Sequence, residues 1–67
     1  MREVATVVFT DVETSDEGVA IVRESPRGVA LCLSLASDGD VEVFLSRDDA
    51  KRVIAALEEA ISTTPRE

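Results

Sequence analysis

Four segments rich in Val, Ile, Leu, Phe and Thr occupy the chain before residue 46, and short polar breaks separate them. Such segments are typical of β-strands, while Gly, Pro, Asp and Ser favour the turns between them. The pattern predicts strands at residues 3–13, 18–24, 29–36 and 41–45. Because the breaks are short, we expect consecutive strands to pair antiparallel, in chain order, as a meander.

A helical period replaces the strand pattern after Leu45 and predicts one helix over residues 47–62, with Ser46 as its N-cap. Pro65 ends any helix, so residues 63–67 are predicted to be a frayed tail. The fold expected for the single domain 1–62 is therefore α+β: a four-stranded antiparallel meander followed by a C-terminal amphipathic helix packed on one sheet face. The apolar helix positions are Ala50, Val53, Ile54, Leu57 and Ile61.

The hairpin loops determine which side chains share a face of the sheet. Three-residue loops at 26–28 and 37–39 place large aliphatic side chains opposite one another, whereas a slip of one residue would reverse the faces of a strand. We therefore expect Leu33 to face both Ile21 and Val43, and we expect the helix to cover the aliphatic face so formed. That face would carry Val19, Ile21, Val29, Leu31, Leu33, Leu35, Val41, Val43 and Leu45.

The opposite face of the predicted sheet has no second helix to cover it, and its residues are small or apolar. A contiguous uncovered apolar patch is typical of an interface. A compact chain of 7.2 kDa exposes about 4,100 Å² and buries about 60 % of its unfolded surface, which is marginal for a lone monomer. The sequence therefore predicts a homo-oligomer, with a dimer as the first guess. The expected self-association residues are Val22, Cys32, Ser34 and Phe44.

Two questions about the first strand stay open at the level of sequence. Its contribution to the uncovered face is either the series at 5, 7 and 9 or the series at 4, 8 and 12. The strand also either pairs within its own chain or is exchanged with a neighbouring subunit, because the loop after it is polar and its register is ambiguous.

Composition excludes most catalytic chemistry. The chain has no His, Trp or Tyr and only one Cys, so it lacks the residues of a Ser-His-Asp triad, a Cys–His pair or a structural zinc site. Neither a GxGxxG pattern nor a P-loop occurs. Cys32 lies between two leucines, and the chain has no histidine that could act as a base for its thiol. Cys32 is therefore predicted to be a small buried hydrophobic residue. We expect no enzymatic activity, no cofactor and no metal.

The net charge of −7 further narrows the classes of partner. Binding to nucleic-acid backbones requires a basic surface, and anionic lipid repels an acidic one, so we expect neither nucleic acid nor membrane as a partner. No apolar run approaches about 18 residues, and the N-terminus has no signal-peptide pattern. A cytoplasmic location is the default expectation.

Two groups of charged residues remain as candidate binding surfaces. An acidic group would meet a basic protein partner; it consists of Asp11, Glu13, Asp16, Glu17, Asp38 and Asp40. A basic group would hold a small anionic, nucleotide-like ligand at a subunit boundary; it consists of Arg23, Arg27, Arg47 and Lys51. The leading hypothesis is a small non-enzymatic homo-oligomer that acts through protein–protein contacts. The alternatives are an acidic inhibitor of a basic effector and a protein that sequesters an anionic ligand.

Overall fold

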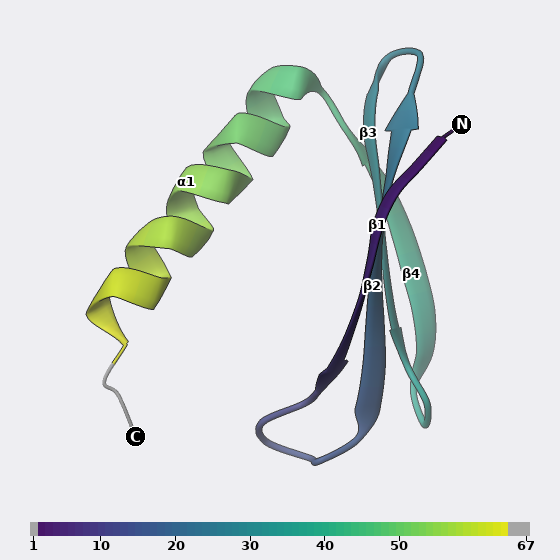
Figure 1. Cartoon of the computed structure of the whole chain (residues 1–67), viewed down its shortest axis with the longest axis vertical. Coiled ribbons are helices and arrows are strands. Elements are labelled where there is room, and N and C mark those ends of the chain that lie inside the picture. Colours follow the sequence, from purple (N-terminus) through teal and green to yellow (C-terminus); the bar gives the residue numbers. More distant parts are fainter. Residues whose placement is uncertain (1, 65–67) are drawn as a thin grey trace.

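Four strands form one antiparallel sheet in chain order, and a single helix follows them (Figure 1). The computed structural model describes residues 2–64. Its elements are β1 (Arg2–Thr10), β2 (Glu17–Ser25), β3 (Gly28–Leu35), β4 (Gly39–Leu45) and α1 (Arg47–Thr63). The helix contacts β3 and β4. The predicted α+β fold with ββββα order is therefore confirmed.

The C-terminal end of the helix differs slightly from the sequence prediction. Thr63 is still helical, and Thr64 is the C-cap, its N–H donating to the carbonyl oxygens of Ala60 and Ile61 at 3.0 and 3.3 Å. The rest of the predicted tail, residues 65–67, lies outside the described residues.

The register between β2 and β3 differs by one residue from the prediction. Leu33 lies opposite Ala20 instead of Ile21. Only Pro26 and Arg27 connect these strands, since Gly28 already pairs with Ser25. A two-residue turn is the commonest hairpin connection, and the shift of one residue reverses the two faces of β2 relative to β3.

The register between β3 and β4 differs by two residues from the prediction. Leu33 faces Val41 instead of Val43, because residues 36–38 form the loop and Gly39 already pairs with Leu35. Side chains alternate with a period of two along a strand, so a shift of two residues changes the partners but leaves both faces as predicted.

β1 pairs antiparallel with β2 of the same chain. An irregularity between Glu3 and Ala5 shifts the pairing by one residue. Beyond it, Phe9 lies opposite Gly18. The Phe9 ring occupies the space above this glycine, where an added Cβ would lie 2.4 Å from the ring.

The observed register sorts the side chains of the sheet into two faces of different character. The first, called here the aliphatic face, carries Ala5, Val7, Phe9, Ala20, Val22, Val29, Leu31, Leu33, Leu35, Val41, Val43 and Leu45. The second, called here the mixed face, carries Glu3, Thr6, Val8, Val19, Ile21, Arg23, Ala30, Cys32, Ser34, Asp40, Glu42 and Phe44.

The connection between the sheet and the helix is a single residue. Ser46 alone separates β4 from α1, and its Oγ accepts a hydrogen bond from the Asp49 N–H at 3.1 Å, as the N-cap prediction requires. Gly28 of β3 packs so closely on this junction that a Cβ there would lie 2.1 Å from the Leu45 carbonyl oxygen. From this junction the helix diverges from the sheet (Figure 1).

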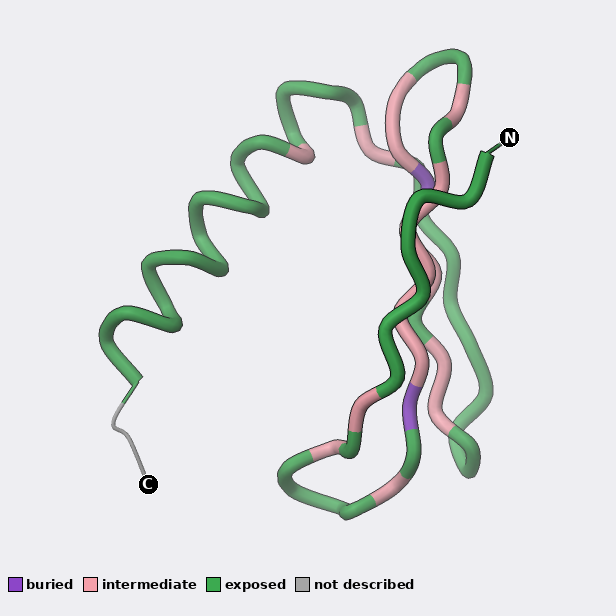
Figure 2. The backbone as a smooth tube through the Cα atoms, viewed as in Figure 1, coloured by how far each residue is buried: buried purple, intermediate pink, exposed green. Residues whose placement is uncertain are grey.

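The single chain has almost no buried core. Ala30 is the only buried hydrophobic residue among those described, and no residue of α1 is buried (Figure 2). The helix contacts β3 and β4 on one face of the sheet, as predicted, but no residue of α1 is buried by this contact. Within residues 2–64 no helix combines the length and apolarity that a membrane crossing requires.

Candidate functional site

The apolar stripe of α1 is the first of two large exposed surfaces. We call it the helix stripe; it consists of Ala50, Val53, Ile54, Leu57 and Ile61. Exposure rises steadily along it, from 38 % at Val53 through 55 % at Ile54 and 59 % at Leu57 to 73 % at Ile61. The stripe is thus partly covered near the junction and open towards the C-terminus, because the helix moves away from its own sheet.

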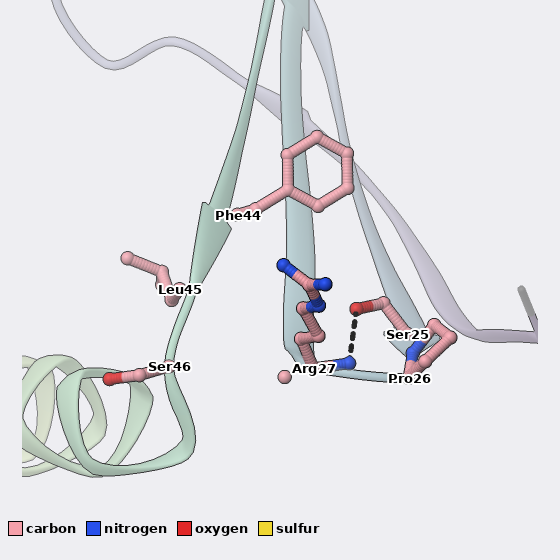
Figure 3. A pocket seen from close by; sticks show the side chains of 7 residues that line it. Ser25, Pro26, Arg27, Phe44, Leu45 and Ser46 are labelled. Atoms are coloured by element: carbon pink, nitrogen blue, oxygen red, sulfur yellow. Dashed lines mark hydrogen bonds between the residues drawn. The ribbon is translucent and has the colours of Figure 1, made fainter.

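The aliphatic face of the sheet is the second exposed surface. Val7, Leu33, Val41 and Val43 all rank among the exposed large hydrophobic residues of the chain. Leu45 projects from β4 on the side of α1, whereas Phe44 projects on the other side (Figure 3). The helix α1 and the aliphatic face therefore lie on the same side of the sheet (Figure 3), and the chain buries neither the residues of α1 nor those of this face.

The accessible surface of the chain measures this lack of cover. It amounts to 5639 Å², whereas a compact protein of this mass exposes about 4,100 Å². The excess is about 1,500 Å² per chain. This excess counts polar and apolar surface together, and its apolar part includes exposed side chains of the helix stripe and the aliphatic face. Exposed apolar patches are typical of protein–protein interaction sites.

Charged groups are nearly absent from both apolar surfaces. No position of the helix stripe carries a charge. On the sheet, Glu24 lies opposite Val29 at the margin of the aliphatic face, and its carboxylate is paired with the Arg2 guanidinium at 3.2 Å. This pairing raises the pKa of Arg2 and lowers the pKa of Glu24, through the hydrogen bond and the attraction between the charges. Both surfaces can therefore be covered without burying an unpaired charge.

The four residues predicted for self-association do not form one patch. Val22 lies opposite Leu31 on the aliphatic face, whereas Cys32, Ser34 and Phe44 lie on the mixed face. The one-residue shift of β2 causes this separation. On the mixed face, Cys32 is half-buried and lies opposite Glu42, whose carboxylate pairs with the neighbouring Arg23 at 3.0 Å. The sequence thus predicted an interface around Cys32, Ser34 and Phe44 on the mixed face, whereas the aliphatic face is the more apolar of the two.

The four cations proposed as an anion site are also separated. Arg23 pairs with Glu42 on the mixed face. Arg27 lines a shallow pocket with Phe44 and Ser46, where its N–H donates to the Ser25 Oγ at 3.3 Å (Figure 3). Neither Arg47 nor Lys51 lines this pocket. The arrangement in one chain does not assemble the four side chains around one ligand.

The acidic residues, in contrast, gather at one end of the sheet. Asp16, in the β1–β2 loop, accepts two hydrogen bonds from Ser37 in the β3–β4 loop, from Oγ at 2.7 Å and from N–H at 3.0 Å. These bonds, the hydroxyl first, lower the pKa of Asp16. Asp11 accepts from the N–H and hydroxyl of Thr14 at 2.8 and 2.9 Å, which lowers its pKa as well.

These bonds give the six acidic residues two different roles. Asp11 and Asp16 shape and tie the loops, which brings the remaining four carboxylates close to one end of the sheet. No hydrogen bond or ion pair within residues 2–64 engages the carboxylates of Glu13, Glu17, Asp38 and Asp40. In the same part of the chain, no three His, Cys, Asp or Glu side chains are grouped so that they could hold a metal ion.

Comparison of the chain with protein-family models, with curated proteins and with solved structures finds no match.

Proposed function

We propose that the protein is a small, non-enzymatic, cytoplasmic homodimer that acts through protein–protein contacts. One observation carries this proposal: a folded chain with Ala30 as its only buried hydrophobic residue among those described. Hydrophobic burial is the main favourable contribution to folding, and a single chain of this shape obtains little of it. Association supplies the burial that the chain lacks.

The chemistry of the exposed surfaces favours self-association as the source of this burial. The helix stripe and the aliphatic face are both apolar, and each is the kind of surface that packs against the other in α+β folds. A second copy offers both surfaces at once. No further partner is needed to cover them, because the interface of a two-fold dimer is formed from the same residues on each side.

Native mass spectrometry of the protein over a range of concentrations tests this proposal. We expect a species of twice 7.2 kDa that persists on dilution. A species of 7.2 kDa at every concentration, with the secondary structure retained, would contradict self-association. Added mass on either species would identify a retained ligand or a second protein.

The acidic end of the sheet favours a second candidate function, the binding of a basic protein. The Asp16–Ser37 hydrogen bonds hold the two acidic loops together. Four carboxylates there have no partner among residues 2–64, and the net charge of the chain is −7. Complementary charge accelerates association and makes it sensitive to salt.

Affinity capture at low salt tests the second function through a matched variant. Glu13→Gln, Asp38→Asn and Asp40→Asn together remove three charges without touching Asp11 or Asp16, whose hydrogen bonds organise the loops. We expect a basic protein to be retained by the natural chain and lost with the variant or at high salt. Equal capture by both chains would exclude the acidic end as the binding surface.

A further inference from the structure

We infer that two copies of the chain exchange their helices, so that α1 of each copy packs its helix stripe on the aliphatic face of the other. This arrangement rests on the self-association proposed above and specifies its geometry. Four features of the structure support it: the rising exposure of the helix, the short connection at Ser46, the matching dimensions of the two surfaces, and the excess accessible area.

The direction of the helix is the first feature. Exposure along the helix stripe rises from 38 % at Val53 to 73 % at Ile61, and the helix diverges from its own sheet with distance from the junction (Figure 1). The helix lies on the side of the sheet that carries the aliphatic face, where Leu45 projects (Figure 3), and the chain itself buries neither the helix stripe nor this face. A helix from a second copy that packs on this face meets apolar side chains of the sheet.

The connection between β4 and α1 explains why the helix does not close on its own sheet. Connections between a strand and a helix usually contain about 2–6 residues, whereas here Ser46 stands alone. Ser46 is also fixed by its role as the N-cap, with φ −65° and ψ 163°. The close approach of Gly28 to the Leu45 carbonyl further restricts movement at this point. Short restricted hinges favour exchange of an element between subunits over closure within one chain.

The dimensions of the two surfaces match. The 17 residues of α1 span about 26 Å. Strands of 7 to 9 residues span about 23–30 Å. A helix laid along the aliphatic face therefore covers it from end to end. The absence of charge from the helix stripe allows this contact to form without burying an unpaired carboxylate.

The area available matches what a stable dimer needs. An excess of about 1,500 Å² per chain corresponds to about 3,000 Å² for two chains, and obligate homodimers bury about 2,000–5,000 Å² in total. A symmetric pair in which both helices are exchanged uses the same two surfaces twice, so the assembly closes as a dimer.

Cross-linking between two different single-cysteine chains tests the exchange. Both chains carry Cys32→Ser, which removes the natural thiol. One also carries Leu57→Cys on the helix stripe, and the other Val41→Cys on the aliphatic face. The two chains, one of them isotopically labelled, are mixed, refolded together and treated with a short bismaleimide. A matched control replaces Leu57→Cys with Ala55→Cys on the opposite side of the helix.

We expect a covalent species that contains one chain of each mass, with at least tenfold less product for the Ala55→Cys control. Native mass spectrometry of the same mixture measures association separately. A dimer whose two chains do not cross-link from Leu57→Cys to Val41→Cys overturns helix exchange and leaves self-association standing. A single chain that carries both Leu57→Cys and Val41→Cys is treated in the same way. A cross-link that forms only within this chain, and not between two chains, also overturns helix exchange. A mixture that contains only monomers overturns self-association itself.

Discussion

Replacing Leu57 by Asp places a charge in the middle of the helix stripe, and the structure gives the size of the expected effect. Full burial of a leucine contributes about 1.5–3 kcal/mol. Because 59 % of Leu57 is exposed in the single chain, association has about 1–2 kcal/mol per chain still to gain there, or about 2–4 kcal/mol per dimer. Losing this contribution raises the dissociation constant by about 30- to 700-fold. Desolvation of the new carboxylate increases the effect further.

Sedimentation equilibrium of Leu57→Asp and of Ala55→Asp measures this difference. The two substitutions introduce the same charge into the same helix, but residue 55 lies on the side away from the helix stripe, so its dissociation constant should match that of the natural chain. Circular dichroism checks the helix content of each variant. If Leu57→Asp does not fold, Leu57→Ala should still weaken association by at least tenfold. Equal dissociation constants for the two Asp variants would show that the helix stripe lies outside the interface.

Three further predictions concern the mixed face, the sheet–helix junction and the acidic end. Phe44→Asp should leave the dissociation constant unchanged, because Phe44 lies on the mixed face. Gly28→Ala should destabilise the fold by about 1–3 kcal/mol in urea unfolding, since its Cβ would meet a backbone oxygen at 2.1 Å. Asp16→Asn should lower stability at neutral pH, because the hydrogen bonds from Ser37 to the ionised carboxylate lower the pKa of Asp16.

Each of these predictions has a control or a contradicting outcome. Dissociation of the dimer by Phe44→Asp would place the interface on the mixed face, as the sequence alone suggested. Gly18→Ala should cost less than Gly28→Ala, because its Cβ would meet the movable ring of Phe9 rather than backbone; the reverse order would argue against a tight junction.

The acid dependence of Asp16→Asn follows from the sign of the pKa shift. A carboxyl whose pKa is lowered in the folded state stabilises the fold above its ordinary pKa of about 4, and this contribution is lost as the pH falls through the lowered value. The difference in stability between the natural chain and Asp16→Asn should therefore shrink below pH about 4. A difference that stays constant down to pH about 2 would show that ionisation of Asp16 is not involved.

The order and type of all five elements were predictable from sequence because local signals agree with one another. The faces of β3 and β4 were also predictable, since large aliphatic residues occupy alternate positions along both strands. β2 was assigned to the wrong faces because positions 19–22 are apolar without interruption. Such a run has no alternation to fix its register, so the length of the turn decides it.

The remaining features depend on geometry that the sequence does not express locally. The helical spacing of the apolar residues in α1 was predictable from the sequence. The divergence of the helix from the sheet was not, because it depends on the angle that the one-residue connection imposes at Ser46. The hydrogen bonds from Ser37 to Asp16 join residues far apart in the chain, so the sequence showed the acidic residues without showing that they gather at one end.

An isotope-filtered NOE experiment on dimers of one ¹³C-labelled and one unlabelled chain detects contacts between the two chains. We expect intermolecular contacts between the methyl groups of Leu57 or Ile61 and those of Leu33 or Val41. If those methyl groups show contacts only within one chain, or none at all, the helix stripe does not cover the aliphatic face of a second copy.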